Sequence, residues 1–249
     1  MPAIALTDHG NLYGAIEFYK KAKKLEIKPI LGVETYVAPN GHLNKRPRID
    51  EERRHLILLA KNETGWKNLI QLVTIANLRG FYYKPRIDRE LLEKYHEGLI
   101  CLSGCFSGEI AKFIATKKDE EAEEAAKFYK KIFGDDFYIE VQPHTPEFQK
   151  KLIELARKLN IKIIGTQDVH YVSKDDKTAH EILLAIQTNS KLDDEDRRQQ
   201  REHQPEEDRA ERDQRGRVHQ RPGAQVVDVV LRVGRRVEPD TRKVSAAWL

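Results

Sequence analysis

The sequence predicts an α/β fold: most of a barrel in which strands and helices alternate, with a mainly parallel sheet inside and helices outside. The first observation is the alternation itself, since short apolar runs and longer amphipathic segments follow one another through roughly the first 190 residues. The second is their number. Six strand-like runs recur over about 170 residues, which suits most of a barrel better than a small open sheet. The third is that polar side chains directly follow several of these strands.

Each predicted strand is a short run of apolar residues that ends in polar or turn-forming residues. The second run is interrupted by a single carboxylate, Glu34, and the third begins with His55. The predicted strands cover residues 2–7, 28–37, 55–60, 98–103, 136–141 and 161–166.

The predicted helices fill the intervals between the strands. Apolar side chains recur every three or four positions in residues 12–25, and residues 147–159 have a similar amphipathic pattern. Gly108 and Gly134 punctuate two further helical stretches. The other predicted helices run from residue 66 to 75 and from 179 to 187.

The N-terminus enters a buried strand almost at once, without a preceding helix to cover it. A parallel sheet needs both faces covered and its neighbouring strands present. We therefore expect that at least one strand–helix unit is missing upstream, so that the barrel is incomplete.

The composition changes abruptly near Arg197. Residues 1–196 hold 31 Lys and Arg against 31 Asp and Glu, whereas residues 197–249 hold 13 against 9 and contain no Ile, Phe or Tyr. We interpret residues 1–196 as a partial barrel with the start of a following region, and residues 197–249 as an Arg-rich, disordered or poorly structured tail. A frameshifted translation is the favoured origin of the tail. A genuine disordered tail and a nucleic-acid-binding arm are the alternatives.

Composition excludes several classes of protein. The net charge of +4 comes entirely from the tail, so it does not indicate a basic, nucleic-acid-binding barrel. Two cysteines cannot form a disulfide framework. No apolar stretch approaches the roughly 20 residues of a membrane span, and no signal peptide is recognisable. These features favour a protein of the reducing cytoplasm.

Candidate metal ligands follow or interrupt three strands. Asp8 and His9 follow the first, Glu34 interrupts the second, and Asp168 and His170 follow the last. Imidazole and carboxylate are common metal ligands, and a carboxylate inside an apolar strand is costly unless it is paired or bound to a cation. The alternatives are that Asp8 caps a helix, that Glu34 lies at an exposed edge, and that Asp168 and His170 belong to a surface turn.

Two further candidates are ambiguous by position. His55 starts its strand, so in a parallel sheet it would lie at the opposite end of the barrel from Glu34, unless the strand runs differently or the preceding loop brings it over. A surface histidine is the alternative. Cys105 follows a strand and is either a thiolate ligand or a buried, inert thiol. Cys101 is expected in the core.

Glu140, Gln142 and His144 alternate along one strand and therefore share a face. His144 is the most plausible of them to reach a site, although solvated loop polarity is favoured. His180 is expected to be a helix residue rather than a ligand. Together, candidates on separate strands predict a cluster of two or three metals that binds phosphate oxygens and activates water.

Several runs closely resemble the N-terminal PHP (polymerase and histidinol phosphatase) domain of bacterial replicative DNA polymerase III alpha subunits. The order and spacing of the runs agree from residue 1 to about Arg197. The runs are residues 2–14, 27–39, 55–62, 98–105 and 167–171, with 183–188 resembling the segment that follows the domain.

The resemblance implies a distorted seven-stranded β/α barrel with a cluster of divalent zinc, manganese or iron ions at one end. It also implies phosphoesterase or 3′–5′ exonuclease chemistry, with Asp8, His9 and Asp168 in catalytic roles. Asp8 would neighbour the site, and His144 is a weaker candidate. The implied ligands are His9, Glu34, His55, Cys105, Asp168 and His170.

The chain also departs from the family pattern. The family begins with a strand carrying His-x-His, which is absent here, so we expect an incomplete cluster and a crippled site. The polymerase core is absent too, so we expect a polymerase fragment that does not polymerise DNA. The full-length protein would bind DNA and other replisome subunits, such as a proofreading exonuclease and a sliding clamp, and no membrane. The alternatives are a non-catalytic scaffold that docks the proofreading subunit, and a free-standing PHP phosphatase.

Overall fold

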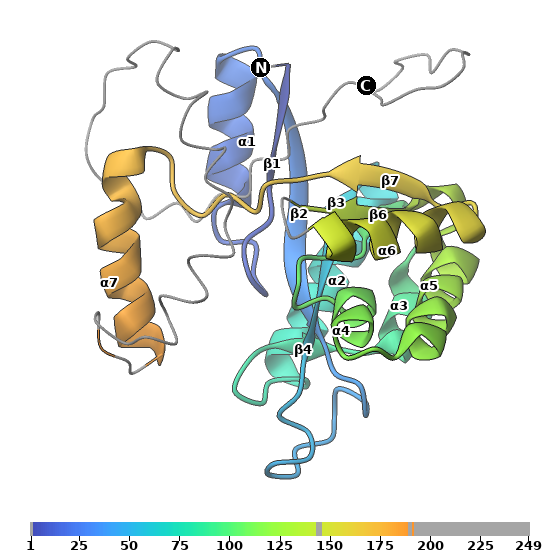
Figure 1. The fold of residues 1–249 in the computed structure, drawn as a ribbon. Coiled ribbons are helices and arrows are strands. Elements are labelled where there is room, and N and C mark those ends of the chain that lie inside the picture. The colour runs from blue at the N-terminus through green and yellow to red at the C-terminus, as the bar shows by residue number, and fades with distance from the viewer. Residues whose placement is uncertain (1, 143–145, 189–190, 192–249) are drawn as a thin grey trace, which may run out of the picture.

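The computed structural model describes residues 2–142, 146–188 and 191 (Figure 1). His144 and the predicted tail, residues 197–249, lie outside the described residues. The predicted domain boundary near residue 196 therefore stays a prediction. None of the helices in the described part is long and apolar enough to span a membrane.

The described residues form a mixed α/β fold, and every strand and helix expected from the sequence is present. The strands are β1 (Ala3–Leu6), β2 (Lys28–Val37), β3 (Arg54–Ala60), β4 (Arg86–Ile87), β5 (Leu99–Leu102), β6 (Phe137–Val141) and β7 (Lys162–Gly165). The helices are α1 (Ala15–Lys24), α2 (Glu63–Leu78), α3 (Arg89–Tyr95), α4 (Glu109–Ala115), α5 (Asp119–Phe133), α6 (Pro146–Lys158) and α7 (Lys177–Thr188).

Two of these elements, β4 and α3, are absent from the sequence prediction. β4 has only two residues, so it has no readable alternation, and its strand pairing with β2 creates it. α3 is a short helix that begins after Asp88, whose side chain accepts a hydrogen bond from the backbone N–H of Leu91. This is the capping signal that a helix start requires.

The strands form one sheet in the order β1-β2-β3-β5-β6-β7, with β4 paired to β2. The sheet curls into a half-barrel, as expected for an incomplete β/α barrel (Figure 1). It is mainly parallel, but β3 runs antiparallel to both β2 and β5. A loop without a helix, residues 38–53, joins β2 to β3, and only antiparallel neighbours can be joined without a crossover. The direction of β3 resolves the ambiguity over His55, which pairs with Tyr36 near the end of β2.

The core has two parts, one on each face of the sheet. Side chains from alternate positions, such as Leu56 and Leu58, pack on the outer face against α2 to α6. The intervening positions, such as Ile57 and Leu59, form a smaller apolar cluster on the inner face with Ala5 and Leu102. This division follows from the period of two along each strand.

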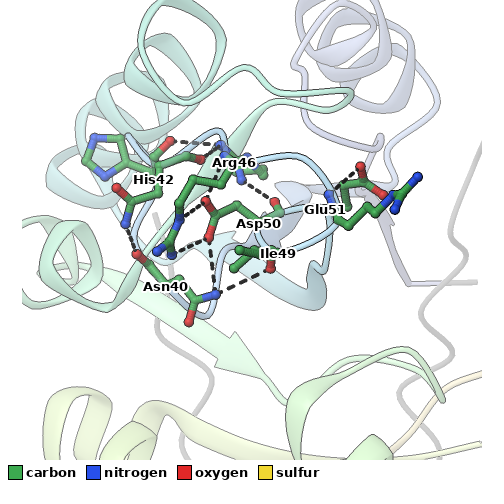
Figure 2. A network of polar contacts seen from close by, with 9 residues as sticks. Asn40, His42, Arg46, Ile49, Asp50 and Glu51 are labelled. Atoms are coloured by element: carbon green, nitrogen blue, oxygen red, sulfur yellow. Dashed lines mark hydrogen bonds and ion pairs between the residues drawn. The ribbon is translucent and has the colours of Figure 1, made fainter.

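The loop of residues 38–53 is organised around the buried carboxylate of Asp50 (Figure 2). Asp50 accepts hydrogen bonds from Nε and Nη2 of Arg46 at 2.8 and 2.9 Å, and from Nδ2 of Asn40 at 3.2 Å. The Arg46 guanidinium holds the pKa of Asp50 well below its usual range. The carboxylate therefore stays ionised and keeps the loop closed.

Arg86 of β4 fastens this loop to the sheet. Its side chain is fully buried, and within the described part of the chain its hydrogen bonds all go to backbone carbonyls. The acceptors are the carbonyl oxygens of Gly80 (3.0 Å), Asp50 (2.8 Å), His42 (3.1 Å) and Asn44 (2.8 Å). One guanidinium thus holds two loops beside the end of β2 and the start of β3.

Candidate metal centre

The inner face of the half-barrel changes from apolar to polar along the strands. Away from the carboxyl ends of the parallel strands, this face is the apolar cluster around Ala5 and Ile57. Toward the carboxyl ends of the parallel strands, the inward-facing positions are polar. The buried members are Thr7, Glu34, Glu140, Gln142 and Thr166. The sheet therefore builds a polar mouth above an apolar floor, the usual place for chemistry in an α/β barrel.

His9 and Glu34 meet because β1 and β2 are parallel and continue to pair beyond β1. The backbone N–H of Gly10 donates to the Glu34 carbonyl at 2.9 Å, and that of Glu34 donates to the Asp8 carbonyl at 3.0 Å. This pairing places Nε2 of His9 3.4 Å from Oε2 of Glu34. Glu34 itself is 1% exposed, so the alternative of an exposed edge is wrong.

His55 and Cys105 approach Glu34 from the other side. Nδ1 of His55 contacts Oε1 of Glu34 and lies 3.5 Å from Sγ of Cys105. His55 also continues the sheet through a bridge to Gly108, the residue that precedes α4. Potential ligand atoms of His9, Glu34 and His55 all lie within 4.8 Å of one another.

Asp168 and His170 lie at the rim of the same mouth. The His170 ring centroid is 6.1 Å from that of His9 and 5.5 Å from that of His180. Nδ1 of His170 lies 2.7 Å from the Asp168 carbonyl oxygen. Donation by Nδ1–H leaves Nε2 of His170 free as an acceptor, a common arrangement for metal-ligating histidines. Asp168 has a φ of 49°, an uncommon conformation that is found most often in Asn, Asp and Gly.

The remaining candidates are not among the clustered ligand atoms, although Asp8 borders the mouth and the His180 ring packs beside that of His170. The carboxylate of Asp8 lies against Gly14 at the start of α1, where the Gly14 backbone N–H donates to it. That position agrees with the helix-capping interpretation. Cys101 is fully buried in the outer core, as expected, and His180 is a residue of α7.

Burial and mutual proximity shift the ionisation of these groups. Burial, together with the nearby histidines, lowers the pKa of His9, which favours the neutral imidazole that binds metals. Burial opposes the ionisation of Glu34, but the hydrogen bond from His55 and the other imidazoles lower its pKa overall. Burial raises the pKa values of Asp168 and of the Cys105 thiol. Burial and the Glu34 carboxylate raise the pKa of Tyr36 to about 12.

Glu140 is a buried acid that the sequence interpretation assigned to solvated polarity. It is 2% exposed, and its Oε1 accepts hydrogen bonds from Nε2 of Gln142 (2.9 Å) and from the Thr166 hydroxyl. Its Oε2 is buried without a hydrogen-bond partner among the described residues. The available signal was its inward position in an apolar strand, the same signal that identified Glu34.

We predict that Glu140→Gln makes the protein more stable at alkaline pH. Burial raises the pKa of Glu140 to about 7, above the ordinary value of 4.5. Between those values the folded state keeps a proton that the unfolded state loses, so stability falls as pH rises through this window. Glutamine keeps the Oε1 acceptor and removes the titration. Urea unfolding in EDTA should show a gain of up to about 3 kcal/mol at pH 8 and little gain at pH 4. A gain that is equal at both pH values would contradict the assignment.

The residues at the mouth fit a divalent cation. Oε2 of Glu34 is buried without a hydrogen-bond partner in the described part of the chain, and a buried carboxylate oxygen needs a proton, water or a cation. Two imidazoles flank it, with a thiol and a second carboxylate close by. This mixture of nitrogen, oxygen and sulfur ligands suits zinc and other first-row transition metals.

Comparison with known proteins identifies the fold. Residues 1–144 match the family described as PHP domain. The chain belongs to the PHP domain family. This chain is 48% identical over 202 residues to the DNA polymerase III subunit alpha of Borreliella burgdorferi and 49% identical over 202 residues to that of Thermus aquaticus. The relative from Aquifex aeolicus is 44% identical over 195 residues.

The similarity covers most of this chain but a small part of its relatives. The match to the Borreliella protein spans 79% of this chain and 18% of the relative, and the Thermus match spans 79% and 17%. For the Aquifex protein the shares are 74% and 17%. The match therefore spans less than a fifth of the length of each of these curated relatives.

Proposed function

We propose that this chain is part of a replicative DNA polymerase III alpha subunit and that its centre hydrolyses phosphoesters with bound metal ions, as a 3′–5′ exonuclease does. The observation that supports this most directly is the buried Oε2 of Glu34, which lies between His9 and His55 and has no hydrogen-bond partner among the described residues. The similarity to alpha subunits supports a nucleic-acid substrate.

The proposed ligands are the six residues at the mouth: His9, Glu34, His55, Cys105, Asp168 and His170. Bound divalent cations would supply Lewis-acid activation of water and would neutralise charge on phosphoryl oxygens. The protein's own part is to orient these groups. The Asp168 carbonyl fixes the tautomer of His170, and the apolar floor excludes water from below.

Three residues are proposed to act on the substrate or on the proton that is released during hydrolysis. Asp168 has a carboxyl group whose pKa is raised by burial, so its carboxylate is suited to take up a proton released at the mouth. His9 faces the centre through Nε2. Asp8 borders the mouth at the start of α1, where it would act on groups that enter beside His9.

In the full-length polymerase, we propose that this domain operates in the cytoplasm beside DNA and other replisome subunits, among them a proofreading exonuclease and the sliding clamp. The domain would then act on, or help to position, a DNA end close to those subunits.

Metal content and hydrolysis, measured on the same preparation of the full chain, test the proposal. After EDTA treatment, the protein is loaded with Zn²⁺, Mn²⁺ or Fe²⁺ at neutral pH, and bound metal is quantified by mass spectrometry. Hydrolysis is measured with bis(p-nitrophenyl) phosphate and with a labelled oligonucleotide. We expect bound metal and only weak metal-dependent hydrolysis, because the His-x-His ligands of the family pattern are not among these residues and the site is proposed to be crippled. His55→Ala should lose both. His96→Ala, at the C-terminal end of α3, should lose neither.

The outcomes separate the alternatives. A chain that binds no metal and hydrolyses neither substrate would exclude the catalytic proposal. A chain that binds metal and hydrolyses neither would favour the scaffold, with a structural metal. Hydrolysis of the small ester alone would favour a free-standing phosphatase.

A further inference from the structure

The segment that joins α2 to β4 (Figure 1) carries exposed aromatic side chains. Phe81 and Tyr83 are 52% and 62% exposed, and the rings of Tyr82 and Tyr83 lie 4.6 Å apart. Lys84 follows them directly. We call residues 81–85 the aromatic loop. Large exposed aromatic side chains that are grouped in this way usually mark a binding surface.

The aromatic loop is held in a strained conformation. Tyr83 has a φ of 58°, which bulky residues rarely adopt. The loop closes below it, because the Tyr82 backbone N–H donates to the Lys84 carbonyl at 3.1 Å and the Arg86 guanidinium donates to the Gly80 carbonyl at 3.0 Å. Such strain persists only where the surroundings enforce it, and it concentrates at functional sites.

Gly10 connects the aromatic loop to the metal centre. Its φ is +68°, and a Cβ at this position would lie 2.5 Å from Cγ of Pro85 and 3.4 Å from the Tyr36 ring. The carbonyl of Gly10 also accepts a hydrogen bond from Asn77 of α2 at 3.1 Å. The loop therefore packs directly on the residue that follows His9.

A lysine of the aromatic loop, Lys84, reaches toward the centre. Nζ of Lys84 lies 5.9 Å from the centre of the Tyr36 ring and forms no ion pair with any residue that the structure describes. The Tyr36 ring is in turn 5.2 Å from that of His55 and 6.0 Å from that of His9. Arg53 is within electrostatic range of the same tyrosine. Lys84 thus borders the centre on the side of the aromatic loop, with Arg53 within electrostatic range and its Nη1 donating to the Glu51 carbonyl at 3.0 Å.

We propose that the aromatic loop binds the end of a single-stranded nucleic acid, with Lys84 and Arg53 on its phosphates and Tyr83 stacked on a base. The direction of the strand toward the metal centre rests on the proposed function. Cations beside exposed aromatic rings match alternating phosphates and bases. A single strand fits because duplex bases stack on one another and do not offer their faces to Tyr83. A protein partner would need no phosphate-binding cations at this position.

Binding of a fluorescein-labelled twelve-residue oligothymidylate to the full chain tests the proposal by fluorescence anisotropy. EDTA is present, so the result does not depend on metal. Tyr83→Gly is the informative variant, because glycine adopts the positive φ without strain and the loop keeps its backbone. We expect Tyr83→Gly to bind the oligonucleotide more weakly, with a Kd roughly 5 to 50 times higher than that of the parent chain. Lys84→Gln should lower the slope of log Kd against log salt by about 0.7.

Matched variants control for general effects. Lys162→Gln removes a lysine that also lies over a tyrosine, 5.6 Å from the Tyr138 ring, but at the opposite end of the strands. Tyr19→Ala removes a partly exposed tyrosine of α1. Both should bind the oligonucleotide as the parent chain does. The same-length duplex should bind the parent more weakly than the single strand does.

The proposal is wrong if Tyr83→Gly and Lys84→Gln bind as tightly as the parent, or if the parent does not bind the single strand. Either result would leave the aromatic loop as a protein-docking surface. Failure to bind metal would exclude the proposed hydrolysis and would not alter this measurement.

Discussion

Replacement of Arg86 by methionine is expected to destabilise the protein by about 3 to 5 kcal/mol. The guanidinium is fully buried and donates to four carbonyl oxygens from two loops. Methionine fills a similar volume but donates no hydrogen bond, so these acceptors lose their partner in a region from which water is largely excluded. Urea unfolding followed by circular dichroism measures the loss.

Two further variants make this test specific. Arg86→Lys keeps the charge but not the fork of donors, so it should lose an intermediate amount. Arg157→Met, at an exposed position near the end of α6, should change stability by less than about 0.5 kcal/mol. If Arg86→Met were as stable as Arg157→Met, the hydrogen bonds of the guanidinium to the two loops would not stabilise the fold.

Replacement of Glu34 by glutamine is expected to weaken metal binding by at least about 100-fold, because changes to the groups that merely support a ligand already cost 10- to 100-fold. The side chains have the same shape, and the glutamine oxygen can still accept from His55. At a metal concentration of about 100 times the parent Kd, the parent should gain about 2.7 kcal/mol of stability from the metal. The variant should gain less than about 0.5 kcal/mol under the same conditions.

The metal-induced shift in unfolding is compared with that of Glu109→Gln. Glu109 is also buried and accepts a hydrogen bond from the Tyr129 hydroxyl at 2.8 Å, but it belongs to α4, outside the centre. This control loses stability without metal yet should keep the full metal-induced gain. An undiminished gain in Glu34→Gln would remove Glu34 from the proposed ligands.

The sequence predicts the repeating architecture well because its signal is local. Alternation of apolar runs with amphipathic segments locates six of the seven strands to within one or two residues, and residues 28–37 match β2 at both ends. β4 has no such signal, since two residues cannot show a period and the pairing with β2 alone makes them a strand. The helix α3 is short and depends on one capping side chain, Asp88.

Some residues of the candidate centre are indicated by local sequence patterns, and others are not. A carboxylate within an apolar strand and a residue spacing of two are visible in the sequence, and they identify Glu34 and the pair Asp168 and His170. They identify Glu140 as well, but the sequence interpretation favoured its solvated alternative. For His55 the strand pattern left the question open, because position along a strand does not reveal the direction of that strand, and only the family resemblance implied a ligand.

The amino-acid order by itself determined which side chains face inward, because the period of two along a strand is a property of the backbone. The tertiary structure decided which of those side chains meet. β3 turns antiparallel and brings His55 beside Glu34, and Arg86 holds two loops against the sheet across 36 residues of chain. Pairing energies between distant segments decide such contacts, and no local pattern encodes them.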